Sequence, residues 1–474
     1  MSPASYRAAP PRVACSTLQV HPRRTKSGHR TRRPSRKRHR DAGPKCPRLR
    51  LTDVTTSPIS NARVTAATVD EAATRVADVA SRTPLELNAR LSEATGAQVW
   101  LKREDLQPVR SYKIRGAYNL IVQLDADARA HGVVCASAGN HAQGVALACR
   151  RLGTRGRIFV PGTTPRQKRE RIVTLGGTDV EVIVVGDSYE DAFRAAQQDA
   201  ADTGAVLVPA FDDPRTISGQ GTVAPEIVEQ LGQAPDLLVV PVGGGGLIAG
   251  MATWLHERHP STRIIGVEPA GAASMGAALA AGAPTPLAEV DPFVDGAAVG
   301  TAGEHTFPLV RDAGAQLVTV EEGHICTEML RLYQSDGIIA EPAGALATAA
   351  LDSIEVTPGS TVVCVVSGGN NDISRYGEVL ERSLIHQGLK HYFLVSFPQE
   401  PGALRRFLDD ILGPDDDITL FDYVKRNNRE TGPALIGVEL ASADDLEGLL
   451  ERLEDSPLGV ERVAPGSPLF HYLL

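Results

Sequence analysis

Lysine is scarce in this chain of 474 residues, which contains eight lysines against 41 arginines. Between residues 51 and 389 the chain keeps Lys102, Lys113 and Lys168 alone. Arginine stays protonated in proteins, whereas lysine can lose its proton and attack a carbonyl group. Each lysine that is kept therefore needs an explanation, and Lys113 in "VRSYKIRGAYNL" comes first, although a surface lysine is the commoner case.

Aromatic residues and paired cysteine motifs are also lacking. Aromatic residues make up 4% of the chain and hydrophobic residues 42%, which is typical of a globular protein with room for two or three domains. The six cysteines form no CxxC or CxxH pattern, so we expect reduced thiols in a cytoplasmic protein. The uncharged stretch at 237–255 is interrupted by Pro241 and four glycines, so no transmembrane helix is predicted.

Acidic residues are almost missing from the first part of the chain. Residues 1–50 hold 15 Lys or Arg and one acid, so this part carries a net charge of +14 and the rest −22. We interpret residues 1–62 as a disordered, dispensable extension or the result of a start codon assigned too far upstream. A nucleic-acid-binding tail or a transit peptide is the alternative. The acidic remainder argues against nucleic acid as the main partner.

Short β-branched runs alternate with amphipathic stretches between about residue 65 and residue 385. This order predicts an α/β fold with mostly parallel sheets covered by helices on both faces, whose ligands lie beyond the carboxyl ends of the strands. The predicted strands are 98–104, 132–137, 156–161, 180–186, 205–209, 236–243, 263–269 and 361–369.

The pattern changes near residue 388. The last part reads as strand, helix, strand, strand and helix with a short apolar tail, which predicts a small ferredoxin-like α+β domain. The predicted division is a basic extension at 1–62, a catalytic domain at 63–386 and a small domain at 387–474.

The motif "PVGGGGLIAG" places four glycines between a buried strand and a helix that begins near Leu247. Free backbone N–H groups and the helix dipole make such a loop a phosphate cradle. The spacing fits neither a dinucleotide fold nor a P-loop, which favours a ligand with one phosphate. A tight turn is the alternative, but it would need fewer glycines. The cradle residues are Gly243, Gly244, Gly245, Gly246 and Leu247.

Two further motifs end predicted strands. "CASAGNHAQG" opens a helix with free amides suited to a substrate carboxylate, and the amide of Asn140 can donate to an oxyanion. In "VVSGGNND" the hydroxyl of Ser367 can bind a ring nitrogen, with an ordinary turn as the alternative. The predicted substrate loop is Ser137, Ala138, Gly139, Asn140 and His141, in which an isolated histidine is more often structural.

A phosphate cradle, a carboxylate pocket and a lysine at a helix start together suit one cofactor. Pyridoxal 5′-phosphate carries one phosphate, one aldehyde and one ring nitrogen, and would use all of these groups. In order along the chain, "SYKIRGA", "SAGNHAQG", "GGGGL", "EPAGA" and "SGGN" closely resemble fold-type II pyridoxal-phosphate enzymes of the threonine dehydratase group. "PQEPGAL" resembles the single, ACT-like regulatory domain of the biosynthetic members.

The resemblance implies roles for individual residues. Lys113 would bond the cofactor and serve as the base, Asn140 would contact its phenolic oxygen, and Ser367 would face the pyridine nitrogen. Glu341 of "EPAGA" would lie near the site, with a structural acid as the alternative, and Tyr112 stands where the family most often has phenylalanine.

The resemblance also bears on metal binding. Related racemases have a carboxylate at the position of Ser274, so Glu268 lacks its partner here. We therefore expect no divalent metal at this place, and a monovalent cation remains open.

The implied reaction converts L-threonine, with L-serine as a second candidate substrate, to 2-oxobutanoate and ammonia. This is the first committed step of isoleucine biosynthesis, with L-isoleucine as the expected inhibitor and a homodimer or homotetramer as the expected assembly. A catabolic dehydratase and serine racemase are the alternatives on the same fold. A non-catalytic sensor is the alternative of another class, but degeneration usually removes the lysine first. No nucleic acid and no membrane are expected as partners.

Overall fold

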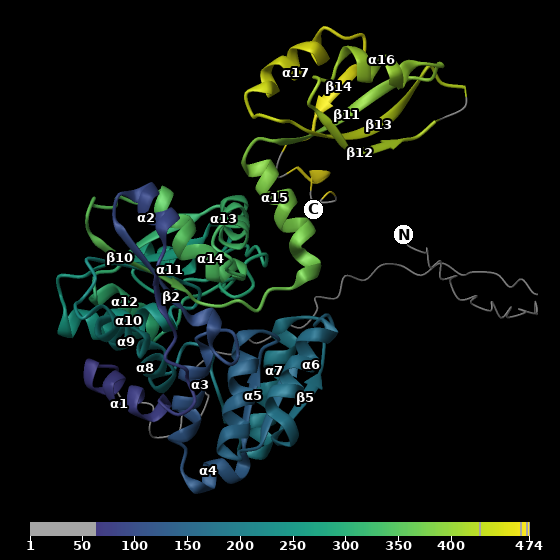
Figure 1. The fold of residues 1–474 in the computed structure, drawn as a ribbon. Helices are drawn as coiled ribbons and strands as arrows, with labels where there is room; N and C mark the ends of the chain where they lie inside the picture. Colours follow the sequence, from purple (N-terminus) through teal and green to yellow (C-terminus); the bar gives the residue numbers. More distant parts are fainter. Residues whose placement is uncertain (1–62, 426–427, 465–466, 471–472, 474) are drawn as a thin grey trace, which may run out of the picture. The chain divides into compact units, whose positions relative to one another are not determined.

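The computed structural model describes residues 63–425, 428–464, 467–470 and 473. The predicted basic extension at 1–62 lies outside the described residues. Figure 1 shows three sheets, two of them in the predicted catalytic part and one in the carboxyl-terminal part.

The larger sheet has six strands in the order β1-β2-β10-β7-β8-β9. Its neighbours are parallel except β1, which is antiparallel to β2. The strands β1 and β9 were not predicted: both lie at edges, and β1 is only three residues long. The bounds are β1 (Leu85–Leu87), β2 (Gln98–Arg103), β7 (Leu237–Pro241), β8 (Arg263–Pro269), β9 (Gln316–Val320) and β10 (Thr361–Val366).

Both faces of this sheet are buried, as expected for parallel strands. In β10, Val362 and Cys364 belong to one core cluster, whereas Val363 and Val365 belong to another. The first face is covered by α2 (Ala89–Thr95), α13 (Glu322–Gln334), α14 (Pro342–Ala349) and α15 (Tyr376–His386). The second is covered by α1 (Ala66–Val76), α8 (Pro214–Gly221), α9 (Val223–Leu231), α10 (Gly246–Arg258), α11 (Ser274–Ala281) and α12 (Thr306–Asp312).

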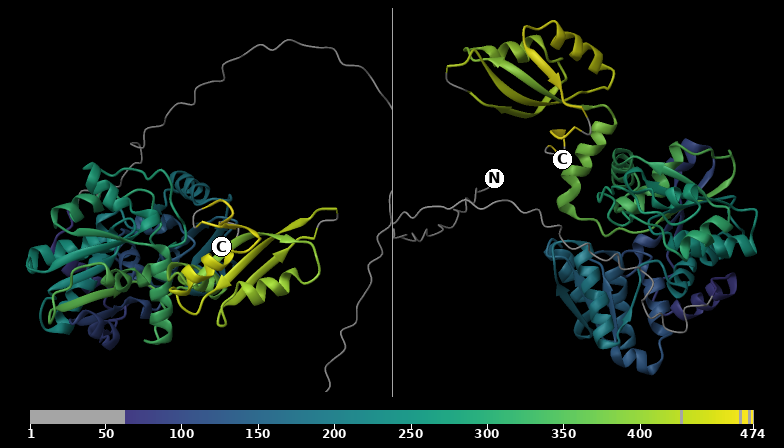
Figure 2. Two further views of the ribbon diagram at one scale, coloured as in Figure 1. Left: turned by 90° about the horizontal axis from the view of Figure 1, so that it is seen from above. Right: turned by 180° about the vertical axis from the view of Figure 1, so that it is seen from behind.

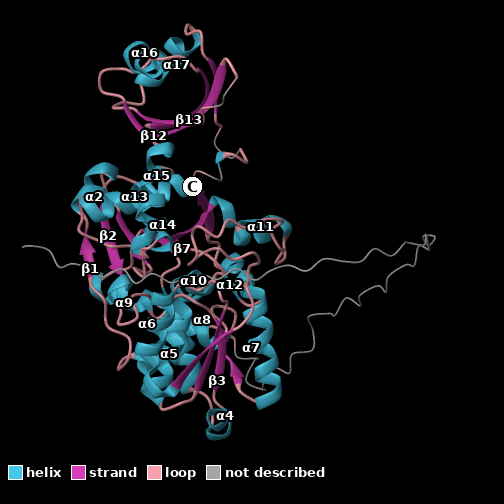
Figure 3. Ribbon diagram, turned by 90° about the vertical axis from the view of Figure 1, so that its right-hand side faces the viewer, coloured by secondary structure: helices cyan, strands magenta, loops and turns pink. Residues whose placement is uncertain are grey.

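The smaller sheet is entirely parallel, in the order β5-β4-β3-β6. One face packs on α3, α5 and α6, and the other on α7 (Figure 3). The strands are β3 (Val133–Ala136), β4 (Gly156–Val160), β5 (Val180–Val184) and β6 (Val206–Leu207). The helices are α3 (Lys113–Val122), α4 (Ala126–His131), α5 (Asn140–Leu152), α6 (Arg166–Gly176) and α7 (Tyr189–Thr203).

The third sheet is antiparallel, in the order β12-β13-β11-β14, which is the strand order of a ferredoxin-like domain. Figure 2 shows its two helices on one face of the sheet. The structure adds a final strand to the predicted order, and that strand is short, with three of its four residues exposed. The elements are β11 (Lys390–Pro398), α16 (Ala403–Asp410), β12 (Asp417–Tyr423), β13 (Thr431–Glu439), α17 (Asp445–Glu454) and β14 (Gly459–Arg462).

The apolar stretch at 237–255 forms β7, the glycine loop and α10, as predicted. Within the described part of the chain, no helix combines the length and the apolar character that a membrane crossing requires.

Candidate active site

A cavity of about 1090 Å³ opens beyond the carboxyl ends of β3 and β7. β3 belongs to the smaller sheet and β7 to the larger one. Within each sheet the parallel strands direct their carboxyl ends to one edge, and the motifs that follow β3 and β7 line the same cavity. The cavity wall therefore brings together most of the predicted site residues. These are Tyr112, Lys113, Ser137, Ala138, Gly139, Asn140, His141, Gly243, Gly244, Gly245, Gly246, Leu247 and Glu341.

Lys113 is the first residue of α3 and lines the cavity. Its Nζ donates a hydrogen bond to the carbonyl oxygen of Ala210 at 3.1 Å and lies 5.2 Å from the ring centre of Tyr112. Among the described residues, Lys113 forms no ion pair with a carboxylate. One neutral hydrogen bond therefore holds the amine of Lys113, and a ligand in the cavity can replace that bond.

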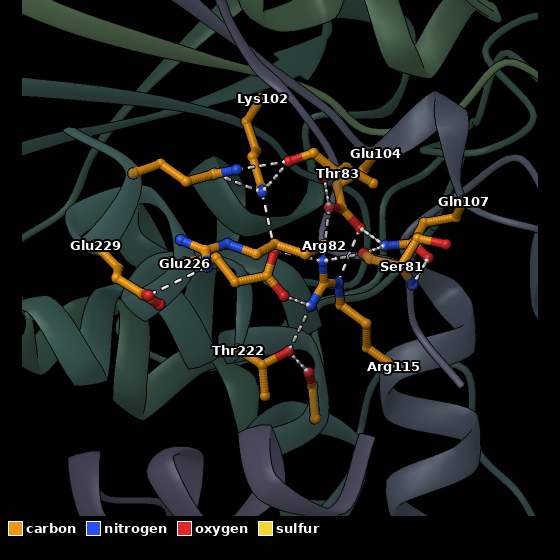
Figure 4. A network of polar contacts seen from close by, with 12 residues as sticks. Ser81, Arg82, Thr83, Lys102, Glu104, Gln107, Arg115, Thr222, Glu226 and Glu229 are labelled. Atoms are coloured by element: carbon orange, nitrogen blue, oxygen red, sulfur yellow. Dashed lines mark hydrogen bonds and ion pairs between the residues drawn. The ribbon is translucent and has the colours of Figure 1, made fainter. Parts of the chain in front are cut away.

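Buried charges fix the start of α3 (Figure 4). Nε and Nη2 of Arg115 each donate to a carboxylate oxygen of Glu104 at 2.8 Å. Nη1 and Nη2 donate to Glu226 at 2.6 and 2.9 Å. The side chains of Arg115 and Glu104 are fully buried. Because Arg115 follows Lys113 by two residues, these bonds hold the turn of helix from which Lys113 projects.

Lys102, on strand β2, also belongs to this network. Its Nζ donates to Glu226 at 2.8 Å, to the carbonyl oxygen of Thr83 at 2.9 Å and to Gln230 at 2.9 Å. Two cations thus face two carboxylates, Glu104 and Glu226. Burial alone would raise the pKa of Glu104, but Arg115 and then Lys102 hold that pKa below its usual value. The network is a neutral, fully hydrogen-bonded cluster that joins β2, α3 and α9.

The four-glycine loop connects β7 to α10 and leaves no room for side chains. A Cβ on Gly244 would lie 2.5 Å from the ring of Phe211, and one on Gly243 would lie 2.9 Å from Cα of Ala297. Gly245 has φ +90°, and a Cβ there would lie 2.4 Å from Met275. The loop and the start of α10 line the cavity with backbone in place of side chains, and the N–H groups at a helix start have no partners within the helix, which fits a phosphate group.

Replacing Gly245 with alanine is expected to weaken cofactor binding by about tenfold or more, because a left-handed backbone costs an L-residue roughly 1–2 kcal/mol and the Cβ also clashes. Titration of cofactor-free enzyme, followed by visible absorbance, measures this affinity. Gly282→Ala is the matched control, because Gly282 has φ +77° with nothing within 4 Å of its Cβ position. Equal losses in both variants would contradict the assignment of the loop.

Asn140 and Glu341 form a hydrogen-bonded pair in the cavity wall. A third residue, Asn370, which was not predicted from the sequence, bonds to both of them. Nδ2 of Asn140 donates to Oε1 of Glu341 at 2.6 Å, while Nδ2 of Asn370 donates to Oδ1 of Asn140 at 2.6 Å. The backbone N–H of Asn370 donates to Oε2 of Glu341 at 3.2 Å. Asn370 lies in the quoted motif "VVSGGNND", so its position after the strand was the signal that could have found it.

Burial, and then the charge of Asp295, raise the pKa of Glu341 to about 7. We expect activity to rise as the pH increases through about 7, because the carboxylate is a stronger acceptor for Asn140 than the neutral acid. The pH profile of kcat/KM should therefore lose this step in Glu341→Gln. Glu268→Gln is the control: burial also raises the pKa of Glu268 to about 7, but Glu268 does not line the cavity among the described residues. An unchanged step in Glu341→Gln would refute this explanation.

His141 and Ser367 have structural contacts. Nε2 of His141 lies 2.8 Å from the carbonyl oxygen of Val208 and donates to it when protonated there. Burial, and then Lys113, lower the pKa of His141 to about 4, so its imidazole is neutral near pH 7. Oγ of Ser367 donates to the carbonyl oxygen of Ala343 at 3.2 Å. Ser367 is not among the described residues that line the cavity, although Gly369 and Asn370, which follow it in the chain, are.

Glu268 ends its strand against the start of α11. Its carboxylate accepts hydrogen bonds from the backbone N–H groups of Met275 at 2.7 Å and Gly276 at 2.8 Å. The nearby hydroxyl of Ser274 is buried and has no hydrogen-bond partner among the described residues. Each oxygen of the Glu268 carboxylate thus accepts one hydrogen bond from the backbone at the start of α11.

Two comparisons of sequence identify the relatives of this chain. The sequence model of the family "Pyridoxal-phosphate dependent enzyme" matches residues 76–368, and that of the "C-terminal regulatory domain of Threonine dehydratase" matches residues 381–473. The biosynthetic L-threonine dehydratase IlvA of Mycobacterium tuberculosis is 63% identical over 410 residues, which cover 86% of this chain and 96% of the relative. The chain belongs to the biosynthetic threonine dehydratase family of pyridoxal-phosphate dependent enzymes.

Solved structures agree with this family. The processed form of threonine deaminase isoform 2 from Solanum lycopersicum has a TM-score of 0.64 and 38% identity, covering 68% of this chain and 96% of that chain. Maize serine racemase has a TM-score of 0.63 and 33% identity, covering 69% of this chain and 99% of that chain. The fold-type II architecture and the regulatory domain expected from the sequence are therefore confirmed.

The geometry fits the family's cofactor, pyridoxal 5′-phosphate. Lys113 lies within reach of an aldehyde in the cavity, and the close-packed glycines at 243–246 offer backbone donors for one phosphate. The amides of Asn140 and Asn370 and the carboxyl of Glu341, which are hydrogen-bonded to one another in the cavity wall, would offer polar contacts to the ring substituents.

Proposed function

We propose that this enzyme deaminates L-threonine to 2-oxobutanoate and ammonia, at a site built around Lys113. The observation that carries the proposal is the shared cavity: the amine of Lys113, the glycine loop and the start of α5 all line it. The names of the relatives support the substrate, since the M. tuberculosis protein is a biosynthetic L-threonine dehydratase.

Bound pyridoxal phosphate supplies an electron sink that acidifies the proton on Cα of the amino acid. Lys113 is proposed to bond the cofactor in the resting enzyme and to remove that proton once its amine is free. The free backbone N–H groups of α5, beside Ser137, Gly139 and Asn140, are proposed to bind the substrate carboxylate and orient Cα toward Lys113. Asn140 is proposed to contact the phenolic oxygen, and Ser367 to face the ring nitrogen.

The reaction is balanced without an external oxidant or reductant. Threonine loses the Cα proton and the β-hydroxyl group, which leave together as water. The resulting enamine moves a proton from nitrogen to Cβ, and water then replaces nitrogen at Cα, so ammonia and 2-oxobutanoate are released. The cavity wall is proposed to keep other water away from the substrate before elimination. In that wall Asn140 is partly buried and Glu341 is buried.

We propose L-isoleucine as the effector of the carboxyl-terminal domain, with L-serine as a second substrate and a homodimer or homotetramer as the assembly. The match to a threonine dehydratase regulatory domain supports an amino-acid effector. We also propose that the enzyme acts in the cytoplasm. The thiols of Cys135, Cys149, Cys326 and Cys364, which are buried and unpaired, support a reducing environment.

The initial rate of 2-oxobutanoate formation from L-threonine, across a series of L-isoleucine concentrations, tests this proposal. We expect turnover that falls steeply as isoleucine increases. Turnover that does not change with the isoleucine concentration would support the dehydratase activity and refute the proposal that isoleucine is the effector. Formation of D-serine from L-serine, without 2-oxobutanoate from threonine, would favour the racemase alternative instead.

A further inference from the structure

A loop at 290–300, without helix or strand, forms one wall of the cavity. It lies between α11 and α12 in the chain. Its position sets the width of the cavity on that side, because most of its residues face the cavity. The lining residues of the loop are Val290, Pro292, Asp295, Gly296, Ala298, Val299 and Gly300.

This loop touches both ligand-binding parts of the site. A Cβ placed on Gly243 of the glycine loop would lie 2.9 Å from Cα of Ala297. A Cβ placed on Gly296 would lie 3.5 Å from Oε1 of Glu341 and 4.0 Å from Nδ2 of Asn140. There is therefore no room for a side chain at these two glycines, and a small displacement of the loop at 290–300 would change the surroundings of the glycine loop and of the Asn140–Glu341 pair together.

Two arginines of the segment 375–382 hold this loop through Phe293, which is 3% exposed. Nη2 of Arg375 donates to the carbonyl oxygen of Phe293 at 2.7 Å, and its guanidinium lies 4.7 Å from the centre of the phenylalanine ring. The guanidinium of Arg382 lies 4.2 Å from the same centre. Backbone and side chain of Phe293 are thus both bound by α15 and the residue before it.

Asp295 extends these contacts across the mouth of the cavity. Its carboxylate pairs with Nζ of Lys168 on α6 at 2.8 Å, and its other oxygen lies 4.0 Å from Nη1 of Arg375. Lys168 belongs to a helix that covers the smaller sheet, whereas the loop follows the larger sheet. Asp295 therefore joins α6 and Arg375 through one carboxylate.

The same helix binds the first strand of the regulatory sheet. Glu381 of α15 pairs with Nζ of Lys390 at 2.5 Å and accepts a hydrogen bond from the hydroxyl of Tyr392. Lys390 and Tyr392 both belong to β11. Oγ of Ser383 on α15 also lies 3.0 Å from Oγ1 of Thr327 on α13, so the helix packs on the catalytic part as well (Figure 1).

We propose that Arg375 is a positioning residue that couples the regulatory domain to threonine binding, by setting the position of the loop at 290–300. An effector changes affinity at a second site only where the two ligands favour different positions of a shared element. Here α15 is that element: Glu381 binds β11, and Arg375 with Arg382 binds the cavity loop. The inference rests on the proposed inhibition by isoleucine.

Arg375→Met tests this coupling, with Arg375→Lys as the conservative variant. We expect the methionine variant to raise KM for threonine by about fivefold with little change in kcat, and to raise the half-inhibiting isoleucine concentration by about fivefold or more. Calorimetric titration without threonine should show that isoleucine still binds, because the contacts of Arg375 with Phe293, Asp295 and Glu378 lie outside the regulatory sheet. Arg375→Lys should restore part of both properties, since it keeps the charge near Asp295 and Phe293.

Arg311→Met is the matched control, because Arg311 lies 5.4 Å from the ring of Phe307 and outside the cavity loop. We expect it to keep the KM and the isoleucine response of the unaltered enzyme. Isoleucine inhibition of Arg375→Met as strong as that of the unaltered enzyme would overturn the inference, and so would an equal loss in Arg311→Met. An unaltered enzyme that ignores isoleucine would instead refute the proposed regulation itself.

Discussion

Replacing Lys113 with alanine is expected to reduce threonine turnover by about 10³-fold or more, since general base catalysis alone contributes about 10²–10⁴-fold. The variant also lacks the amine that is proposed to bond the cofactor. The fold should survive, because the side chain of Lys113 donates one hydrogen bond within the described part of the chain, to Ala210, and such a bond contributes about 1 kcal/mol. Turnover by the purified variant and its unfolding in denaturant measure the two effects separately.

Lys168→Ala is the matched comparison for this prediction. Lys168 also lines the cavity, but its Nζ is engaged by Asp295 at the mouth. We expect this variant to keep threonine turnover within about tenfold of the unaltered enzyme, because a partly exposed ion pair contributes about 0–1 kcal/mol. Substantial turnover by Lys113→Ala, or an equal collapse in both variants, would contradict the assignment of Lys113.

The second large effect is expected at Arg115. Arg115→Leu removes the guanidinium that pairs with Glu104 and Glu226 and leaves Lys102 as the one cation facing both carboxylates, and breaking a buried pair in this way typically costs about 3–5 kcal/mol. The free energy of unfolding, measured with urea on the cofactor-free enzyme, should fall by this amount. Turnover should fall as well, because the start of α3 loses the bonds that hold the turn carrying Lys113.

Arg166→Leu provides the control. Arg166 forms an ion pair with Glu170 at 2.6 Å, as short as any formed by Arg115, but its side chain is 84% exposed. Its replacement should leave unfolding unchanged within the error of measurement. If Arg115→Leu had the same free energy of unfolding as Arg166→Leu, the buried network would not be what holds the start of α3 in place.

Local signals predicted the parts of the site that follow strands. The glycine loop and the helix starts at Lys113 and Asn140 were predictable because a strand, a turn and a helix follow one another within a few residues. The parallel order then placed each of them at the carboxyl edge of its own sheet, whereas the meeting of the two edges at one cavity was visible only in the structure. Two strands, β1 and β9, and the final strand β14 escaped prediction because edge strands are short or half-exposed and carry a weak pattern.

Long-range partnerships could not be predicted from one sequence. Arg115 and Glu226 are 111 residues apart in the chain, and charged side chains are normally expected at the surface. Arg375 and Phe293 are 82 residues apart, with no local motif linking them. The scarcity of lysine drew attention to Lys102 and Lys168, yet only the structure assigned Lys102 to the buried network and Lys168 to Asp295.

Lys113 is proposed to bond the cofactor. Borohydride reduction of the cofactor-loaded enzyme, followed by digestion with trypsin and mass spectrometry, tests it most directly, because reduction fixes the cofactor to the lysine that holds it. We expect the label on a peptide spanning Ser111–Arg115, uncleaved after the modified lysine. A label on Lys102 or Lys168, with Lys113 unmodified, would contradict the account.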